Sequence, residues 1–272
     1  MNALAQIRRH LGIYGVLLRN SLMVHMEYRF NFYAGLAMET GFLLSKLTYA
    51  YVIVEAGVTF GDLRPAEALV VLGFYTLMTG FYACFFMANN FDLSAKIRNG
   101  DLDLVLVKPV SSLFMVSCAR AEFSLLLPNA IAGITMIAIG IDMQRTPLSV
   151  AAVAVSLVAM ALGLVAAYSL MILPQFLAFR LGTTQAVTQL SHALWDLNTV
   201  PASAFSRGVR WFGTYALPIF MLTNFPAYAL LDRLPVGDMI WLASAAALWL
   251  GLTVVSWKYA LRSYASASGW SQ

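Results

Sequence analysis

The sequence predicts an all-α integral membrane protein with six membrane-spanning helices and both termini in the cytoplasm. Of its 272 residues, 60% are apolar and only 11% are charged, whereas about 25% of residues are charged in a typical soluble domain. Several charge-free runs reach the roughly 20 residues that a helix needs to cross a bilayer. Lys and Arg residues gather in alternate connecting segments. This composition excludes a soluble enzyme, a nucleic-acid-binding module and a disordered chain.

Residues 1–27 are expected to form an amphipathic helix on the inner membrane surface rather than a cleaved signal. The apolar residues of this stretch recur every three or four positions, which places them on one helical face: Leu4, Ile7, Leu11, Tyr14 and Leu18. Arg8 and Arg9 lie mostly off that face. A basic amphipathic helix of this kind can lie along a bilayer. The alternative is a solvated helix that packs on a soluble partner.

Six segments are predicted to cross the membrane. Three of them contain the charge-free runs 68–91, 123–141 and 239–257, and the first span carries Glu39 and Lys46. The charge-free run 146–179 is too long for one upright span and too short for two, so we expect one span with a cytoplasmic end broken at Pro174. The six predicted spans are residues 30–57, 68–90, 111–141, 148–179, 182–205 and 238–260.

Residues 206–234 are expected to form short helices that enter the outer leaflet and return. The stretch is long enough for a span, but Pro218 and Pro226 would each interrupt a helix. A seventh span would also place the C-terminus outside and weaken the positive-inside pattern. With six spans, 11 Lys and Arg residues fall in cytoplasmic segments and five fall outside.

The chain lacks the sequence patterns of common hydrolytic sites. It contains no GK dipeptide, and therefore no Walker A phosphate loop, and it has no HExxH, GxSxG or Cys/His cluster. Cys84 and Cys118 lie in or beside apolar segments without metal-ligand spacing. We therefore expect no enzymatic activity, metal or cofactor in this chain. If it moves a solute, the energy would come from a partner or from a gradient.

The largest inner loop, between the second and third spans, is expected to carry a short charged helix. Residues 92–98 can form a polar helix that Asn99-Gly100 would end. The candidate functional residues of this loop are Asp92, Lys96, Arg98, Gly100, Asp101 and Asp103. The alternative is a loop that is only solvated.

The fifth predicted span carries polar residues on one helical face, at spacings of four, three, four and three positions: Gln185, Gln189, His192, Asp196 and Thr199. A polar stripe that faces lipid is costly, so this one must face protein or water. It would line a translocation path, form the interface with a second subunit, or join helices through hydrogen bonds. His192 and Asp196, four residues apart, could also pair with each other.

Glu39 and Lys46 are two further candidates for the path or the interface. They lie seven residues apart on one face of the first span, with their backbones separated by about 10 Å along the helix. A direct pair would need a long reach or a bridging water, and each could instead pair across a subunit boundary. Intramembrane charges of this kind are functional candidates by default.

Three segments resemble the permease subunits of bacterial ABC type-2 exporters. The stretch Ile97-RNGDLDLVLVKPVSSLF-Met115 is similar to their signature RxGELDxxLLRPxxPLF. Asp101 and Lys108 stand where Glu and Arg are usual, so the charges are kept. The stretch Glu27-YRFNF-Tyr33 resembles EYRxNF, and Ala216-LPIFMLTNFPAYAL-Leu231 resembles LPFAFVNYFPAxxLL.

The resemblance implies a permease without enzymatic activity in an ATP-driven exporter of the bacterial plasma (inner) membrane. Two permeases, the second being a related chain or another copy, would sit over an ATPase dimer that binds ATP and Mg²⁺. The loop from Asp92 to Asp103 would couple to the ATPase. Charge and length alone leave two other functions open: a gradient-driven carrier that uses Glu39, Lys46, His192 and Asp196, and a membrane scaffold that docks a soluble partner.

Overall fold

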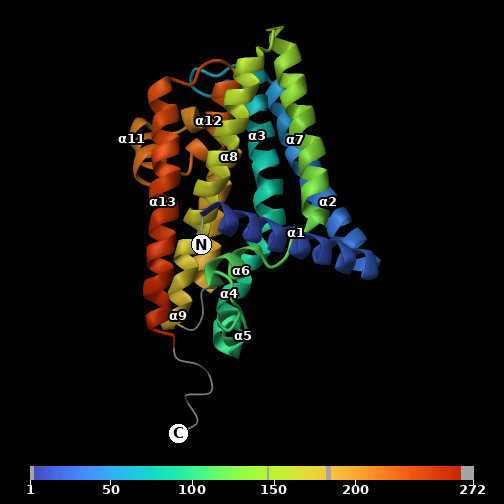
Figure 1. The fold of residues 1–272 in the computed structure, drawn as a ribbon. Helices are drawn as coiled ribbons and strands as arrows, with labels where there is room; N and C mark the ends of the chain where they lie inside the picture. Colours follow the sequence, from blue (N-terminus) through green and yellow to red (C-terminus); the bar gives the residue numbers. More distant parts are fainter. Residues whose placement is uncertain (1–2, 146, 182–184, 265–272) are drawn as a thin grey trace.

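The computed structural model describes residues 3–145, 147–181 and 185–264, whose regular elements are helical apart from one isolated β-bridge. A bundle of long helices forms the body of the protein (Figure 1): α2 (Arg29–Glu55), α3 (Pro65–Tyr82), α7 (Phe123–Gln144), α8 (Val150–Ile172) and α13 (Val236–Arg262). The amphipathic segment forms α1 (Ala3–Glu27), which lies across the bundle. Three short helices lie at the end of the bundle nearest α1: α4 (Ala88–Asn99), α5 (Leu102–Leu106) and α6 (Ser112–Cys118).

Four helices in the described residues are long and apolar enough to cross a membrane: Pro65–Asn99, Phe123–Gln144, Val150–Leu181 and Val236–Arg262. The first joins α3 to α4 through a π-helical turn at Ala83–Met87. The third joins α8 to α9 (Ala178–Leu181) through a 3-10 turn at Leu173–Leu177, which contains Pro174, the predicted break. The helix α2, with 27 residues, is as long as α13, but it carries Glu39 and Lys46.

Glycines bring α3 and α7 into close contact at the centre of the bundle. A Cβ at Gly133 would lie 2.8 Å from the carbonyl oxygen of Gly73, and one at Gly140 would lie 2.7 Å from that of Ala66. Small residues of this kind let two membrane helices approach backbone to backbone. The residues of α3 are almost all buried, so this helix is the core against which the others pack.

The predicted third span, 111–141, differs from the structure because residues 119–122 separate α6 from α7. The sequence of this break has no Pro or Gly, and its backbone polar groups are satisfied by other helices. Asn89 of α4 accepts from the N–H of Arg120 at 3.2 Å, and Ser21 of α1 accepts from that of Ala121 at 3.0 Å. A helix can be interrupted inside a protein when the backbone polar groups at the break are paired in this way.

The predicted fifth span, 182–205, contains one α-helix of 12 residues, α10 (Gln185–Asp196), followed by 3-10 turns at Leu197–Thr199 and Ala202–Ala204. Residues 182–184 lie outside the described part. At 1.5 Å per residue, α10 rises about 18 Å, against a hydrocarbon core of about 30 Å. The helix ends where Asn198 and Thr199 donate to the carbonyls of Trp195 and Asp196, as such side chains do at helix ends. Pro201 then prevents continuation.

Residues 206–234 form short helices, and Pro218 lies in the interruption between two of them as predicted, but Pro226 does not interrupt a helix. The helix α11 (Arg207–Trp211) continues into a π turn at Phe212–Ala216, and α12 (Met221–Leu230) follows. Pro226 lies inside α12, and its carbonyl accepts from Ser156 of α8 at 2.8 Å. These elements lie in the half of the bundle away from α4–α6 (Figure 1).

Candidate functional site

A cavity of about 240 Å³ lies where α2, α3 and α10 meet. Four of the residues predicted from the sequence line it: Glu39 and Lys46 from α2, and His192 and Asp196 from α10. Five aromatic side chains contribute to its wall: Phe42, Tyr75, Tyr82, Phe91 and Trp195. The cavity therefore combines acidic, basic and aromatic groups from helices that are far apart in the sequence.

Asn129 of α7 connects the two charged residues of α2. Its Nδ2 donates to Glu39 Oε1 at 2.6 Å, and its Oδ1 accepts from Lys46 Nζ at 3.3 Å. Asn129 is fully buried, and Gly80 of α3 makes room for it, because a Cβ at position 80 would lie 2.6 Å from Asn129 Cβ. The spacing of Glu39 and Lys46 predicts a bridging water or a partner in another subunit. In the structure, the amide side chain of Asn129 from the same chain bridges them instead.

Asp196 and His192 of α10 contact separate aromatic partners. Tyr75 OH donates to Asp196 Oδ1 at 3.4 Å, and the ring of His192 lies 4.8 Å from that of Phe91. No ion pair joins His192 to Asp196 among the described residues. Lys46 Nζ lies 5.3 Å from the centre of the Tyr75 ring, within the range of a cation–π contact. Tyr75 therefore lies between the charged groups of the two helices.

The helix α10 faces the core with Ser191 and Trp195. Trp195 Nε1 donates to Thr79 Oγ1 at 3.1 Å, and its ring stacks on that of Tyr82 at 4.7 Å. Other members of the predicted polar face are exposed in the single chain: Gln185, Gln189, His192 and Asp196. Gln185, Gln189 and Thr199 do not line the cavity. The polar face is therefore free to meet water or another chain.

Asn129, Tyr75 and Trp195 are three residues with polar contacts at this site that the sequence did not single out. Asn129 is the one amide side chain in the charge-free run 123–141, and this is the signal that could have identified it. Within the described residues, no group of three or more His, Cys, Asp and Glu side chains could hold a metal ion. The cavity presents charged groups, hydrogen-bonding groups and aromatic surface to a solute.

The predicted coupling loop is a packed element whose tip is exposed. Gly100 ends α4 in the left-handed conformation with φ of 80°, as the Asn99-Gly100 pair predicts. Leu93 and Leu102 are fully buried at its base, with Val116 and Trp257 in the same cluster. The exposed side chains of the tip are Arg98, Asp101, Leu104, Val107 and Lys108. Because its base belongs to the core, the element is not merely a solvated loop.

The other candidates of this loop are less exposed. Asp92 forms an ion pair with Arg120, beside the break between α6 and α7. Lys96 and Asp103 are both half-buried. Among the candidate residues of this loop, Arg98 and Asp101 are therefore the charged ones most accessible to a partner, and Lys108 of the same tip is exposed as well.

The break at residues 119–122 joins α1, α4 and α7. Besides the bonds from Asn89 and Ser21, the N–H of Glu122 donates to the carbonyl of Cys84 in the π turn at 2.9 Å. His25 Nε2 lies 3.0 Å from the carbonyl oxygen of Ala121. Every one of these contacts is long-range in the sequence, so the break could not be found from local patterns.

Comparison with known proteins gives one finding. A family model described as ABC-2 family transporter protein matches residues 41–268. The match includes the α4–α5 loop, both short helices of residues 206–234 and every residue that lines the cavity except Glu39. No curated protein and no solved structure matches the chain.

Proposed function

Because the chain belongs to the ABC-2 transporter family, we propose that it is the permease subunit of an ATP-driven exporter. In this proposal the chain has no enzymatic activity and holds no cofactor. Separate ATPase subunits bind ATP and Mg²⁺, and two permeases, either identical or related, form the translocation path. The location is the bacterial inner membrane.

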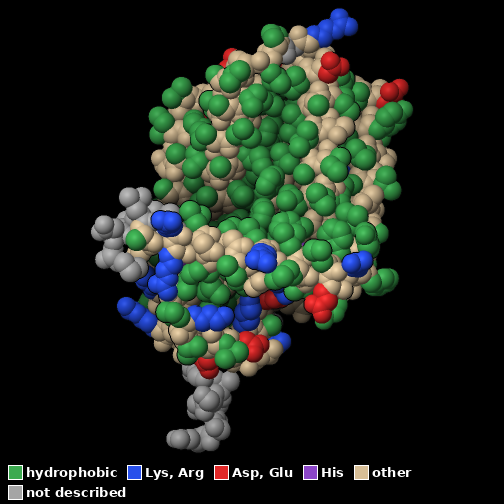
Figure 2. Space-filling view, turned by 45° about the vertical axis from the view of Figure 1, so that its right-hand side comes forward, with side chains coloured by type: hydrophobic (Ala, Val, Ile, Leu, Met, Phe, Trp, Pro, Cys, Tyr) green, Lys and Arg blue, Asp and Glu red, His purple; other side chains and the backbone are tan. Residues whose placement is uncertain are grey.

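The proposed topology has six spans and both termini in the cytoplasm. Figure 2 shows Lys and Arg side chains gathered on the lower part of the viewed face, below a broad apolar surface. The α4–α6 elements lie at this lower end (Figure 1). The positive-inside rule therefore favours a cytoplasmic position for this end. Two of the six spans would be α2 and the segment that contains α10, and α11 and α12 would dip into the outer leaflet.

The cavity and the outward face of α10 are the proposed path and permease interface. Glu39, Lys46, His192 and Asp196 meet at the cavity, and exposed Gln185 and Gln189 extend its polar character along α10. Polar residues at membrane depth are stable when they face water or protein. A second permease placed against α10 would give this face such a partner.

The observation that supports coupling most directly is the form of the α4–α5 element. Its base is buried in the core at Leu93 and Leu102, whereas Leu104 and Val107 at its tip are 66% and 81% exposed. An exposed apolar pair between Arg98 and Lys108 is suited to a groove on a partner protein. Because the base is rigidly packed, a force applied to the tip would reach the bundle.

The test is purification of the tagged full chain from its native membrane. We expect an ATPase with a Walker A motif to be recovered with it. Leu104→Asp combined with Val107→Asp should reduce this recovery and ATP-driven transport by about ten-fold or more, because burying two carboxylates at an apolar contact is costly. Leu148→Asp combined with Val150→Asp is the matched control, since both residues are exposed at the opposite end of the bundle.

Three results would overturn the proposal. Transport that follows an imposed ion gradient without ATP would identify a gradient-driven carrier. Recovery of a soluble protein without ATPase activity would identify a scaffold. Equal loss of the ATPase in the tip variant and in the control variant would show that the α4–α5 tip is not its docking site.

A further inference from the structure

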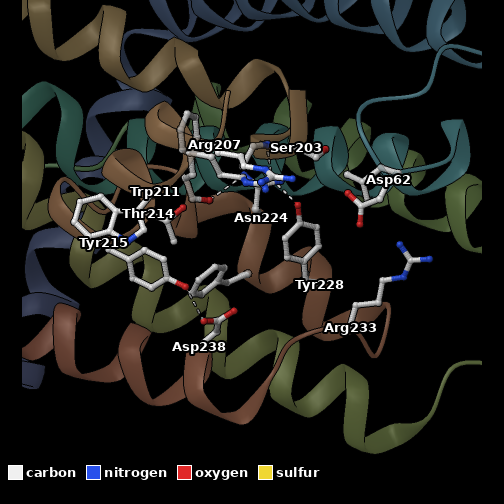
Figure 3. A pocket seen from close by; sticks show the side chains of 15 residues that line it. Asp62, Ser203, Arg207, Trp211, Thr214, Tyr215, Asn224, Tyr228, Arg233 and Asp238 are labelled. Carbon is white, nitrogen blue, oxygen red and sulfur yellow. Dashed lines mark hydrogen bonds between the residues drawn. The ribbon is translucent and has the colours of Figure 1, made fainter. Parts of the chain in front are cut away.

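A second, larger cavity of about 460 Å³ lies in the half of the bundle away from α4–α6. Residues from four parts of the chain line it: the 62–63 segment, residues 202–203, the α11–α12 region and the start of α13. Figure 3 shows the rings of Trp211 and Tyr215 on one side, and Asp62 and Arg233 on the opposite side. None of these residues belongs to the path or to the coupling loop.

Three arginines line this cavity, and within the described part of the chain two of them form no ion pair and no side-chain hydrogen bond. Arg233 is bound to Glu67, with Nη2 2.7 Å from Oε1 and Nη1 3.2 Å from Oε2. Arg207 and Arg210 lie three residues apart on α11, which places them on the same side of that helix. No described residue forms an ion pair or a side-chain hydrogen bond with either guanidinium.

The acidic residues of the cavity do not neutralise this pair. Asp238 accepts a hydrogen bond from Tyr215 OH at 3.2 Å, and among the described residues neither Asp62 nor Asp238 forms an ion pair with Arg207 or Arg210. The free cationic groups are therefore concentrated at α11. Two guanidinium groups with no partner can each bind an oxyanion through two parallel N–H donors.

Apolar surface lies directly beside the free arginines. Trp211 follows Arg210 on α11 and is 62% exposed, and Phe220 closes the floor as a fully buried ring. Trp and Tyr rings beside Arg side chains are typical of the depth at which lipid headgroups meet acyl chains. The cavity thus has an anion-binding part and an apolar part in contact.

We propose that this cavity binds an amphiphile through a phosphate-bearing headgroup, with Arg207 and Arg210 on the phosphate and Trp211 against the apolar part. Phosphate presents more acceptor oxygens than carboxylate, and so satisfies more of the N–H donors that two guanidinium groups supply. Phosphate could reach the site on a lipid or as a free ion. The exposed indole beside the arginines favours the lipid. This inference does not depend on the proposed ATP-driven function.

The experiment measures binding to the full chain, purified and delipidated in detergent, by native mass spectrometry. The probes are phosphatidic acid, diacylglycerol of the same chain length, and inorganic phosphate. We expect phosphatidic acid to bind, diacylglycerol not to bind, and inorganic phosphate to bind far more weakly. Arg207→Gln combined with Arg210→Gln should lower the affinity for phosphatidic acid at least about ten-fold, the usual size of losing charge-assisted hydrogen bonds.

Arg145→Gln is the matched control, because it removes an exposed arginine at the same end without touching the cavity. It should leave binding unchanged, and Trp211→Ala should weaken binding of the lipid only. Each single arginine substitution should lower the affinity by a smaller factor, so the test does not depend on the stability of the double variant.

Several outcomes would overturn the inference. Unchanged affinity in the double variant would remove the role of the two arginines. An equal loss of affinity for phosphatidic acid in Arg145→Gln would show that the lipid is attracted to any basic surface of the protein. Inorganic phosphate binding as tightly as phosphatidic acid, with no effect of Trp211→Ala, would show that the ligand is a soluble phosphate and not an amphiphile.

Discussion

Substitution of Gly133 by alanine is expected to destabilise the packing of α3 on α7. The added Cβ would lie 2.8 Å from the carbonyl oxygen of Gly73, 2.9 Å from the backbone nitrogen of Leu77 and 3.0 Å from its Cβ. Two of these three atoms belong to the backbone, so no rotation of a side chain can relieve the contact. The helices must move apart, and overpacking of this kind costs about 1–3 kcal/mol.

Gly41→Ala is the matched control for this substitution. Gly41 lies inside α2, and a Cβ there would meet no atom within 4 Å. Both alanines gain the same helix propensity, which is about 1 kcal/mol relative to glycine. The difference between the two variants therefore isolates the overpacking, and Gly133→Ala should be less stable than Gly41→Ala by about 1–3 kcal/mol.

The assay is unfolding of the purified full chain in detergent, followed by tryptophan fluorescence. Equal unfolding free energies of the two alanine variants would refute the close approach of α3 and α7. The effect should also reach the cavity, because Asn129 precedes Gly133 by four residues and lies on the same face of α7. Gly80, which makes room for Asn129, would move with α3.

Three other perturbations test the site, the coupling loop and the topology. Asn129→Leu leaves Glu39 and Lys46 without their shared partner and should cost about 1–3 kcal/mol, measured by the same unfolding assay; an unchanged stability would contradict the bridge. Gly100→Val places a β-branched residue at φ of 80°, with a local cost of about 1–2 kcal/mol, and should raise the ATP hydrolysed per solute transported without affecting membrane insertion. Single cysteines at Arg207 and Arg233 should both be labelled from outside, and labelling from opposite sides would exclude the six-span topology.

Local chemistry explains which parts of the fold could be predicted from the sequence. The end of α4 follows from Gly100, and the interruption between the π turn and α12 follows from Pro218, whereas Pro226 lies inside α12 and does not end it. Both signals act within a few residues of where they occur. The helical face that carries His192 and Asp196 could be predicted for the same reason, because helical periodicity is also a local property of the sequence.

Long-range contacts explain what the sequence could not predict. The segment 119–122 has ordinary helix-forming residues, and its interruption is stabilised by Ser21 and Asn89, which are distant in the chain. The spacing of Glu39 and Lys46 indicated a shared face but not the partner, because Asn129 belongs to another helix. Periodicity gives the face of a helix, whereas the neighbour of that face depends on the packing of the whole bundle.

The same long-range contacts define how a displacement of α4 would reach the cavity. The side chain of Asn89 of α4 forms two hydrogen bonds with the backbone of Arg120: it donates to the carbonyl at 2.8 Å and accepts from the N–H at 3.2 Å. The helix α7 begins three residues later at Phe123 and carries Asn129. Moving α4 must therefore either break these hydrogen bonds or carry the start of α7 with it. Glycine packing fixes α7 to α3 further along, so a displacement of α4 relative to α3 must be taken up by the π turn at Ala83–Met87, which connects these two helices. This turn contributes Ala83 and Met87 to the cavity wall.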